Sequence, residues 1–179
     1  MKTRTVTLST GASFSVPQGV QRLDSKSTRG WQVRYQGTKY FPDGEVGPSQ
    51  ALEAATRELL RRIATMPAPV SLRRASNPKK TSGLPVGISG PIVIGKAGTD
   101  AMSAVLSVAV PRFGKVNLTK KVHIGTPSTY TKSRYRQALA KAIEIREQGM
   151  AQYEAEATKA KRGQAATLKK ALRSAASGA

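Results

Sequence analysis

Alternating apolar and polar residues between positions 19 and 64 predict three short strands followed by one helix. The clearest strand is residues 31–35, in which alternate side chains are apolar and share one face: Trp31, Val33 and Tyr35. Gln32 and Arg34 then lie on the opposite face. Residues 19–23 and 39–41 predict the flanking strands. Gly37 suits a tight turn between the second and third strands because glycine tolerates a positive φ.

The helix is predicted to begin after Ser49, a candidate N-cap, and to end at Met66-Pro67. Its apolar residues recur at spacings of three, four and four: Leu52, Ala55, Leu59 and Ile63. A helix with this stripe covers one face of a three-stranded sheet. We expect the other face to stay uncovered and to hold Arg22, Gln32 and Arg34, with Lys39 as a further candidate. The facing of Arg22 and of Lys39 depends on the strand register, which the sequence does not fix.

A weaker version of the same order recurs over residues 84–148. Residues 89–94, 102–110 and 115–125 predict three strands, and the last two are joined by a Pro-Arg-Phe-Gly turn. A helix follows, with these residues on or near one face: Tyr135, Leu139, Ala142, Ile143 and Arg146. The predicted fold class is therefore α+β, with two small modules that each pack a three-stranded antiparallel sheet on one C-terminal helix.

The chain divides into four parts on this pattern. They are the first module with an N-terminal hairpin (1–66), a basic Pro/Ser-rich linker (67–83), the second module (84–148) and a basic helical tail with a disordered end (149–179). The hairpin, predicted over residues 3–17, either extends the first sheet or forms a flexible arm that carries Lys2 and Arg4. Gly163 is expected to interrupt the tail helix, and disorder is expected from Ser174.

Several short motifs of the first module together resemble the AP2/ERF-type DNA-binding domain, in particular the AP2-like modules of phage and bacterial proteins. They are, in chain order, Gly19-Val20-x-Arg22, Trp31-x-Val33-Arg34, Tyr40-Phe41 and Ala51-Leu52-x-Ala54-Ala55. In that family a three-stranded sheet enters the DNA major groove and a helix packs behind it. The resemblance implies base or phosphate contacts for Arg22 and Arg34. It implies less for Lys26 and Arg29, which stand in the variable loop between the first two strands.

The second module is similar to the same family at its strand-to-helix junction, from His123 to Leu139, and departs from it elsewhere. Its opening has no arginine that matches Arg22, and Ser107 or Ala109 stands where Arg34 stands in the first module. We expect this module to read bases differently or to hold mainly phosphates. Its candidate contacts are Arg112, Lys115, Lys120 and Lys121.

Charge points to an anionic partner. Thirty Lys and Arg against ten Asp and Glu give the 179 residues a net charge of +20, far beyond what solubility needs. Nucleic acid is the first candidate partner. A membrane surface ranks second because long helices with bulky apolar faces are missing. The chain has no cysteine and no apolar run of transmembrane length, which fits a cytoplasmic protein.

The linker carries four cations that no acid opposes: Arg73, Arg74, Lys79 and Lys80. Such a run is ordinarily a solvated segment. Because this one joins two candidate DNA-binding modules, a second interpretation is that it follows the phosphate backbone or the minor groove. The sequence leaves both interpretations open.

An enzyme is not expected, so no catalytic residue, metal ligand, cofactor or small-molecule substrate is assigned. The single histidine, His123, is expected to be structural, and the chain has no nucleophile elbow. Its aspartates lack metal-ligand spacing. No Gly-rich loop followed by Lys-Ser/Thr is present to bind phosphate.

The leading hypothesis is a transcription regulator that binds double-stranded DNA with sequence preference through tandem AP2-like modules. Arg22, Gln32 and Arg34 would approach base edges, since Arg pairs with guanine and Gln with adenine. One alternative is an architectural protein that coats or bends DNA without choosing sequence. A further alternative is an RNA-binding protein of ribosomal type, although the sheet lacks the paired exposed aromatics of common RNA-binding sheets.

Overall fold

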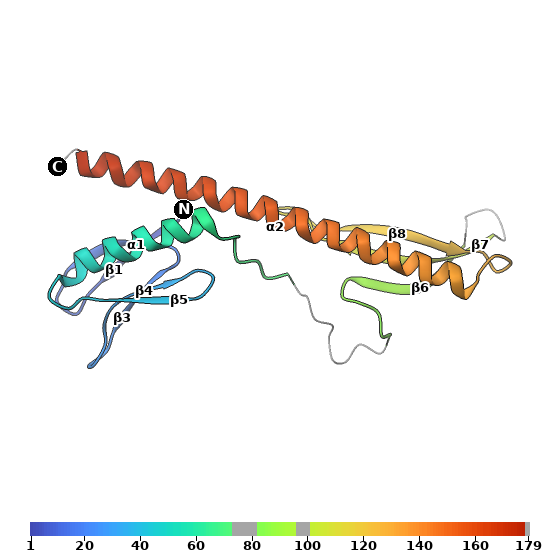
Figure 1. Cartoon of the computed structure of the whole chain (residues 1–179), viewed down its shortest axis with the longest axis horizontal. Helices are drawn as coiled ribbons and strands as arrows, with labels where there is room; N and C mark the ends of the chain where they lie inside the picture. Colours follow the sequence, from blue (N-terminus) through green and yellow to red (C-terminus); the bar gives the residue numbers. More distant parts are fainter. Residues whose placement is uncertain (73–81, 96–100, 178–179) are drawn as a thin grey trace. The chain divides into compact units, whose positions relative to one another are not determined.

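The computed structural model describes residues 1–72, 82–95 and 101–177, which form an α+β fold with three antiparallel sheets and a long C-terminal helix (Figure 1). The chain splits into two compact units. Unit 1 comprises Met1–Pro69 and Ala157–Ala179, and unit 2 comprises Val70–Glu156. The four linker cations, at positions 73, 74, 79 and 80, lie outside the described residues.

The described residues form ten elements. They are β1 (Thr3–Thr7), β2 (Ser13–Pro17), β3 (Val20–Asp24), β4 (Arg29–Arg34), β5 (Thr38–Pro42), α1 (Gly47–Thr65), β6 (Ile88–Gly95), β7 (Met102–Val110), β8 (Leu118–Gly125) and α2 (Lys132–Ser177). The sheets are β1-β2, β3-β4-β5 and β6-β7-β8.

The sheet β3-β4-β5 of unit 1 packs one face on α1. Trp31 and Val33 of β4 are fully buried, and the indole Nε1 of Trp31 donates a hydrogen bond to the carbonyl oxygen of Pro48 at 2.8 Å. This confirms Trp31 as a core residue. Gln36 and Gly37 both have positive φ in the three-residue turn between β4 and β5, as glycine at position 37 allows.

Helix α1 presents the predicted apolar stripe to the sheet. All four stripe residues are buried: Leu52, Ala55, Leu59 and Ile63. The predicted cap is wrong, because the helix begins at Gly47, and Val46 occupies the N-cap without a side-chain hydrogen bond. Pro48 lies in the first turn, where its missing N–H costs nothing.

The N-terminal hairpin forms its own two-stranded sheet and does not extend β3-β4-β5, contrary to the first expectation. It is not a free arm either. Val16 is fully buried in the core of unit 1, and the ring of Phe14 meets the ring of Trp31 edge-on with centroids 5.9 Å apart. The hairpin is therefore fixed beside the sheet by apolar packing.

The sheet β6-β7-β8 of unit 2 encloses a second core with the first turns of α2. Leu106 and Val108 of β7 are fully buried against Ala138 and Ala142. Arg146 enters this unit, where its guanidinium donates to the carbonyl oxygen of Ala109. Burial lowers the pKa of Arg146 from its ordinary value.

Helix α2 continues through Gly163, so the expected interruption is wrong, and it reaches Ser177. The residues from Ala157 onward belong to unit 1. Three of them are buried at spacings of eight and three: Ala157, Ala165 and Leu168. None of the described helices combines the length and the apolar character needed to cross a membrane.

Candidate nucleic-acid interface

The face of β3-β4-β5 opposite α1 is polar and open to solvent. The strand register places Gln21, Gln32 and Tyr40 side by side across the three strands. Arg34 and Thr38 form the next pair on this face, and both are exposed. None of the described strand residues on this face is acidic. We call this surface, formed by Gln21, Gln32, Arg34, Thr38 and Tyr40, the open face.

Arg34 and Gln32 form a joined pair at the centre of the open face. The Nε of Arg34 donates to Oε1 of Gln32 at 2.6 Å. The bond orients the planar guanidinium along the sheet surface and leaves its terminal nitrogens as donors. A planar fork of this kind suits bidentate contact with a phosphate or with a guanine edge.

Tyr40 is fixed on the open face by a glycine on the neighbouring strand. Its hydroxyl donates to the carbonyl oxygen of Arg29 at 2.8 Å. The ring covers Gly30, where a Cβ would come within 2.8 Å of the Tyr40 ring and would overlap the carbonyl oxygen of Phe41. The aromatic ring thus occupies the space that the missing side chain leaves, and 37% of Tyr40 remains exposed.

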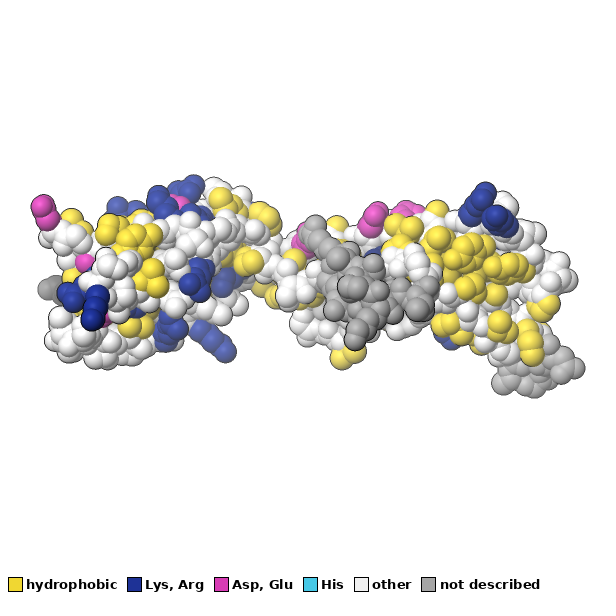
Figure 2. Space-filling model, turned by 90° about the horizontal axis from the view of Figure 1, so that it is seen from below, with side chains coloured by type: hydrophobic (Ala, Val, Ile, Leu, Met, Phe, Trp, Pro, Cys, Tyr) yellow, Lys and Arg dark blue, Asp and Glu magenta, His cyan; other side chains and the backbone are white. Residues whose placement is uncertain are grey.

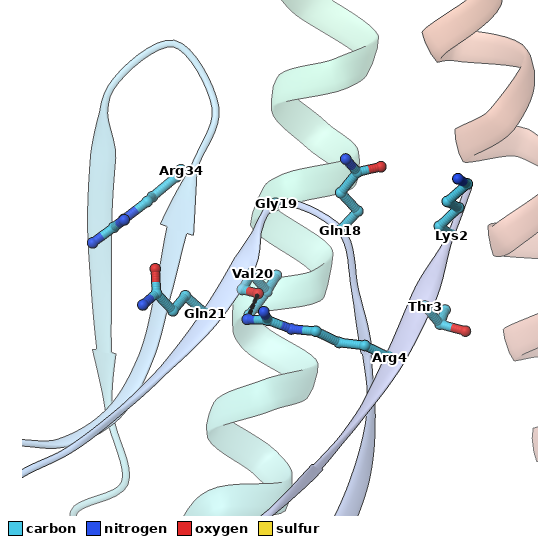
Figure 3. Close-up of a pocket in the computed structure, with 8 residues that line it drawn as sticks. All are labelled: Lys2, Thr3, Arg4, Gln18, Gly19, Val20, Gln21 and Arg34. Atoms are coloured by element: carbon cyan, nitrogen blue, oxygen red, sulfur yellow. Dashed lines mark hydrogen bonds between the residues drawn. The ribbon is translucent and has the colours of Figure 1, made fainter.

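A hollow of about 370 Å³ adjoins the open face where β1 passes the start of β3. Its cations come from two elements, with Lys2 and Arg4 from the hairpin and Arg34 from β4 (Figure 3). None of the described residues that line it is acidic. We call it the hairpin–sheet hollow; it is lined by Lys2, Thr3, Arg4, Gln18, Gly19, Val20, Gln21 and Arg34.

Arg4 is the side chain that spans the hairpin–sheet hollow. Its Nη2 lies 3.5 Å from the carbonyl oxygen of Val20, at the long limit of a hydrogen bond. In Figure 3 its guanidinium extends from β1 toward β3, and the Gln21 amide lies between it and Arg34. Three cations and two amides therefore surround a space open to an anion.

Arg22 does not lie on the open face, and this corrects the expected grouping. It pairs across the strands with Trp31, so it shares the face that packs on α1. Its guanidinium forms two hydrogen bonds with Asp43, at 2.8 and 2.7 Å, and lies 5.1 Å from the centre of a Trp31 ring. The hydrogen bonds to Asp43 raise the pKa of Arg22. The side chain is 9% exposed.

The other expected cations of the first sheet also lie off the open face. Lys39 pairs with Val33 and therefore belongs to the helix side, where its Nζ lies 5.3 Å from the Phe41 ring centre. Arg29 is exposed and lies 3.8 Å from Asp24. Lys26 is exposed in the turn between β3 and β4.

The four candidate cations of unit 2 are exposed but dispersed: Arg112, Lys115, Lys120 and Lys121. The first two lie in the turn between β7 and β8, where Arg112 donates to the carbonyl oxygen of Val116. Lys121 pairs with Ser107, on the side away from α2, and Lys120 pairs with the buried Val108. The structure does not gather them into one cluster.

The two three-stranded sheets share one detail of backbone geometry. Gly19 and Gly87 both precede the first strand with positive φ. The carbonyl oxygen of Gly19 accepts from the amide of Arg34 at 2.8 Å, and that of Gly87 accepts from the amide of Ala109 at 2.7 Å. Ala109 therefore occupies in unit 2 the position of Arg34 in unit 1.

Positive charge extends over unit 1 as a whole, with sixteen Lys and Arg against five Asp and Glu. Figure 2 shows many Lys and Arg side chains and few acidic ones on the visible face of this unit, at the left. The described residues hold no group of three or more His, Asp or Glu side chains suited to a metal ion.

The sequence identified two of the five open-face residues, Gln32 and Arg34, as candidate contacts. It missed Gln21, Thr38 and Tyr40, since only the strand register shows which side chains accompany Gln32 and Arg34. The sequence placed Lys2 and Arg4 only in a candidate flexible arm. Comparison with protein-family models, curated proteins and solved structures finds no match to this chain.

Proposed function

We propose that this chain binds double-stranded DNA through the open face of unit 1 and acts as a sequence-preferring regulator of transcription. The observation that carries the proposal is the Arg34–Gln32 pair on an acid-free sheet face beside Lys2 and Arg4. The major groove admits a two-stranded β-ribbon, and in the AP2 family, which the first module resembles, a three-stranded sheet enters it. Arg34 and Gln32 are the residue types that recognise guanine and adenine edges there.

The roles divide between the sheet and the hairpin. Arg34, Gln32 and Gln21 face outward from the centre of the sheet, where base edges would lie. Lys2 and Arg4 stand beside the first strand, where the sugar–phosphate backbone would pass. Phosphate contacts fix register and base contacts select sequence, so the hairpin would position the duplex that the sheet reads.

Unit 2 is, in this proposal, a divergent second AP2-like module. The matched glycines, Gly19 and Gly87, and their matched carbonyl hydrogen bonds support a shared plan. Ala109 replaces Arg34, and unit 2 exposes apolar residues such as Val93, which is 66% exposed. This unit would therefore contribute phosphate contacts through its dispersed cations rather than base readout.

An architectural DNA-binding protein is the second candidate function. The specific observation in its favour is that Arg22, one of the two arginines expected from the AP2 resemblance, is engaged by Asp43. Fewer base-reading arginines and high charge over both units favour binding that depends on phosphates alone. Such a protein would lack a large affinity ratio between a cognate and a random duplex.

Selection of bound duplexes from a random-sequence pool at near-physiological salt would separate these candidates. The wild type, Arg34→Ala and Lys39→Ala would be selected in parallel. Lys39 is the matched control, since its replacement removes the same charge from the same sheet on the helix side. We expect an enriched motif with the wild type and Lys39→Ala, and a relaxed motif with Arg34→Ala.

Two other outcomes decide against parts of the proposal. A motif that Arg34→Ala leaves unchanged would move base readout away from the open face. Tight binding with no motif, which collapses as salt rises, would overturn the regulator and leave the architectural protein. Competition by structured RNA that exceeds competition by duplex DNA would overturn both.

A further inference from the structure

A second cationic surface lies in unit 1 between α1 and the last turns of α2. The groove has a volume of about 490 Å³. Arg57 and Arg61 line it from α1, and Arg162 and Lys169 line it from α2. All four side chains belong to exposed residues. We call this surface the α1–α2 groove.

Most of this charge is not neutralised within the unit. Arg61 is paired with Glu58 at 2.8 Å. Arg57, Arg162 and Lys169 take part in none of the ion pairs between described residues. From Ala157 to the end of the chain the sequence has six Lys and Arg and no Asp or Glu. The groove thus concentrates positive charge, and few acidic side chains of the described residues pair with it.

The shape of the α1–α2 groove suits an extended polyanion. Apart from its four cations, the groove is lined by apolar residues of both helices: Leu60, Ile63, Ala64, Ala165 and Ala166. The positive charge continues along α2, because Arg173 follows Arg162 by eleven residues, a rise of about 16 Å in an α-helix. That length matches about five successive phosphates of one DNA strand, spaced about 3.4 Å along the helix axis.

The α1–α2 groove and the open face lie on opposite sides of unit 1. Helix α1 packs on the sheet face that carries Trp31 and Val33, and the last turns of α2 lie on the far side of α1 (Figure 1). A straight duplex against the open face is separated from the groove by the sheet and by α1. The two surfaces would therefore contact different DNA segments.

We propose that unit 1 bridges two DNA segments, one held on the open face and one held by its phosphates in the α1–α2 groove. This inference rests on the proposed function, since it takes the first segment to lie on the open face. The groove offers arginine and lysine head groups and no amide or aromatic partner for base edges among its lining residues. It would therefore hold the second segment without regard to sequence.

A bridging assay tests this inference. A biotinylated duplex on beads captures a fluorescent duplex of different sequence only when protein joins the two. The groove variant is Arg57→Ala/Arg162→Ala/Lys169→Ala. The control variant, Lys132→Ala/Arg134→Ala/Arg136→Ala, removes the same charge from exposed residues of unit 2 that are not among its proposed phosphate contacts. We expect the groove variant to capture at least tenfold less fluorescence than the wild type, and the control variant to capture nearly as much as the wild type.

The affinity for a single duplex, measured in parallel by anisotropy, distinguishes a loss of bridging from a loss of DNA binding. We expect the groove variant to bind one duplex within about threefold of wild type, since the open face is intact. Equal bridging by wild type and groove variant would overturn the inference and leave the proposed function standing. Equal loss in both variants would also overturn it, because bridging would follow total charge. Failure of the wild type to bind any duplex would overturn the proposed function itself.

Unfolding and self-association are checked separately. Urea unfolding of the groove variant should give a midpoint close to that of the wild type, because the three side chains are exposed. Sedimentation of the free wild-type protein shows whether it is a monomer. If bridging occurs only at concentrations where the protein self-associates, two chains hold one duplex each and the two-surface inference is wrong.

Discussion

At the scale of single residues, the alternation of side chains along the strands places Arg22 and Arg34 on opposite faces of the sheet. Arg22 pairs across the strands with Trp31 and is held by Asp43 on the helix side. Arg34 is exposed on the open face, where its side chain bonds a neighbouring amide side chain, Gln32. The first arginine therefore serves stability, and the second is available to a ligand.

Replacing Arg22 by Ala should destabilise unit 1 by about 2–3 kcal/mol, because the carboxylate of Asp43 would lose two hydrogen bonds at a site only 16% exposed. Arg34→Ala should change the free energy of unfolding by less than about 0.5 kcal/mol. Urea unfolding followed by circular dichroism measures both. Equal effects of the two variants would contradict the assignment.

The residue scale is also where the sequence was least informative. The alternation of residues 31–35 correctly placed Gln32 and Arg34 opposite Trp31. The facing of Arg22 depends on how β3 pairs with β4, and the turn at residues 25–28 sets that register. A shift of one residue would have put Arg22 on the open face, so no pattern within β3 itself could decide it.

At the scale of elements, Arg62 ties α1 to the turn that follows β4. Its Nη1 donates to the carbonyl oxygens of Tyr35 and Gly37 at 3.1 and 3.0 Å, and its Nε donates to Glu58 at 2.8 Å. Hydrogen bonds from Arg61 and Arg62 lower the pKa of Glu58 to about 2. The ion pair on the helix thus holds the residue that anchors the sheet turn.

Because the folded-state pKa of Glu58 is depressed, its stabilising effect is complete above its unfolded value, about 4.5, and is lost as pH falls toward 2. The difference in free energy of unfolding between wild type and Glu58→Gln should therefore be largest above pH 5 and shrink toward pH 2. Unfolding by urea across this pH range tests it. A difference that stays constant across this pH range would contradict the role assigned to Glu58.

Replacing two glycines of α2 by alanine should change the free energy of unfolding in opposite directions. A methyl group added at Gly163 would meet no neighbouring atom within 4 Å, so Gly163→Ala should stabilise by about 0.5–1 kcal/mol. At Gly149 an added methyl group would overlap the side chain of Val110, so Gly149→Ala should destabilise by about 1–3 kcal/mol. Urea unfolding compares the two. Stabilisation by both would contradict the packing of α2 on β7.

At the scale of the whole molecule, charge is the property that the sequence predicted most directly. The net charge of +20 is shared by both units, with the excess of Lys and Arg over Asp and Glu at eleven in unit 1 and nine in unit 2. The order of strands and helices was also predictable, because apolar residues recur every second position in strands and every three or four positions in helices. The hairpin's packing and the membership of the last turns of α2 in unit 1 were not, because both depend on segments distant in sequence.

The salt dependence of DNA binding should show whether Lys2 and Arg4 of the hairpin contact phosphates. The slope of log K against log salt concentration should become shallower by about 2 in Lys2→Ala/Arg4→Ala, at about 0.9 for each phosphate that the variant no longer neutralises. Arg29→Ala/Lys39→Ala removes the same charge from elsewhere on the same unit, off the open face, and should change the slope less. Anisotropy titrations over a range of salt concentrations give these slopes. Equal changes in both variants would contradict phosphate binding at the hairpin–sheet hollow.

The central claim is that DNA lies on the open face of β3-β4-β5. The most direct test is the dissociation constant for one duplex, measured at one salt concentration, with Arg34→Ala and Lys39→Ala. These residues lie on adjacent strands and on opposite faces of the same sheet. We predict that Arg34→Ala weakens binding about tenfold or more, corresponding to about 1.4 kcal/mol, and that Lys39→Ala weakens it less than about threefold. Equal losses, or a larger loss with Lys39→Ala, would contradict the claim.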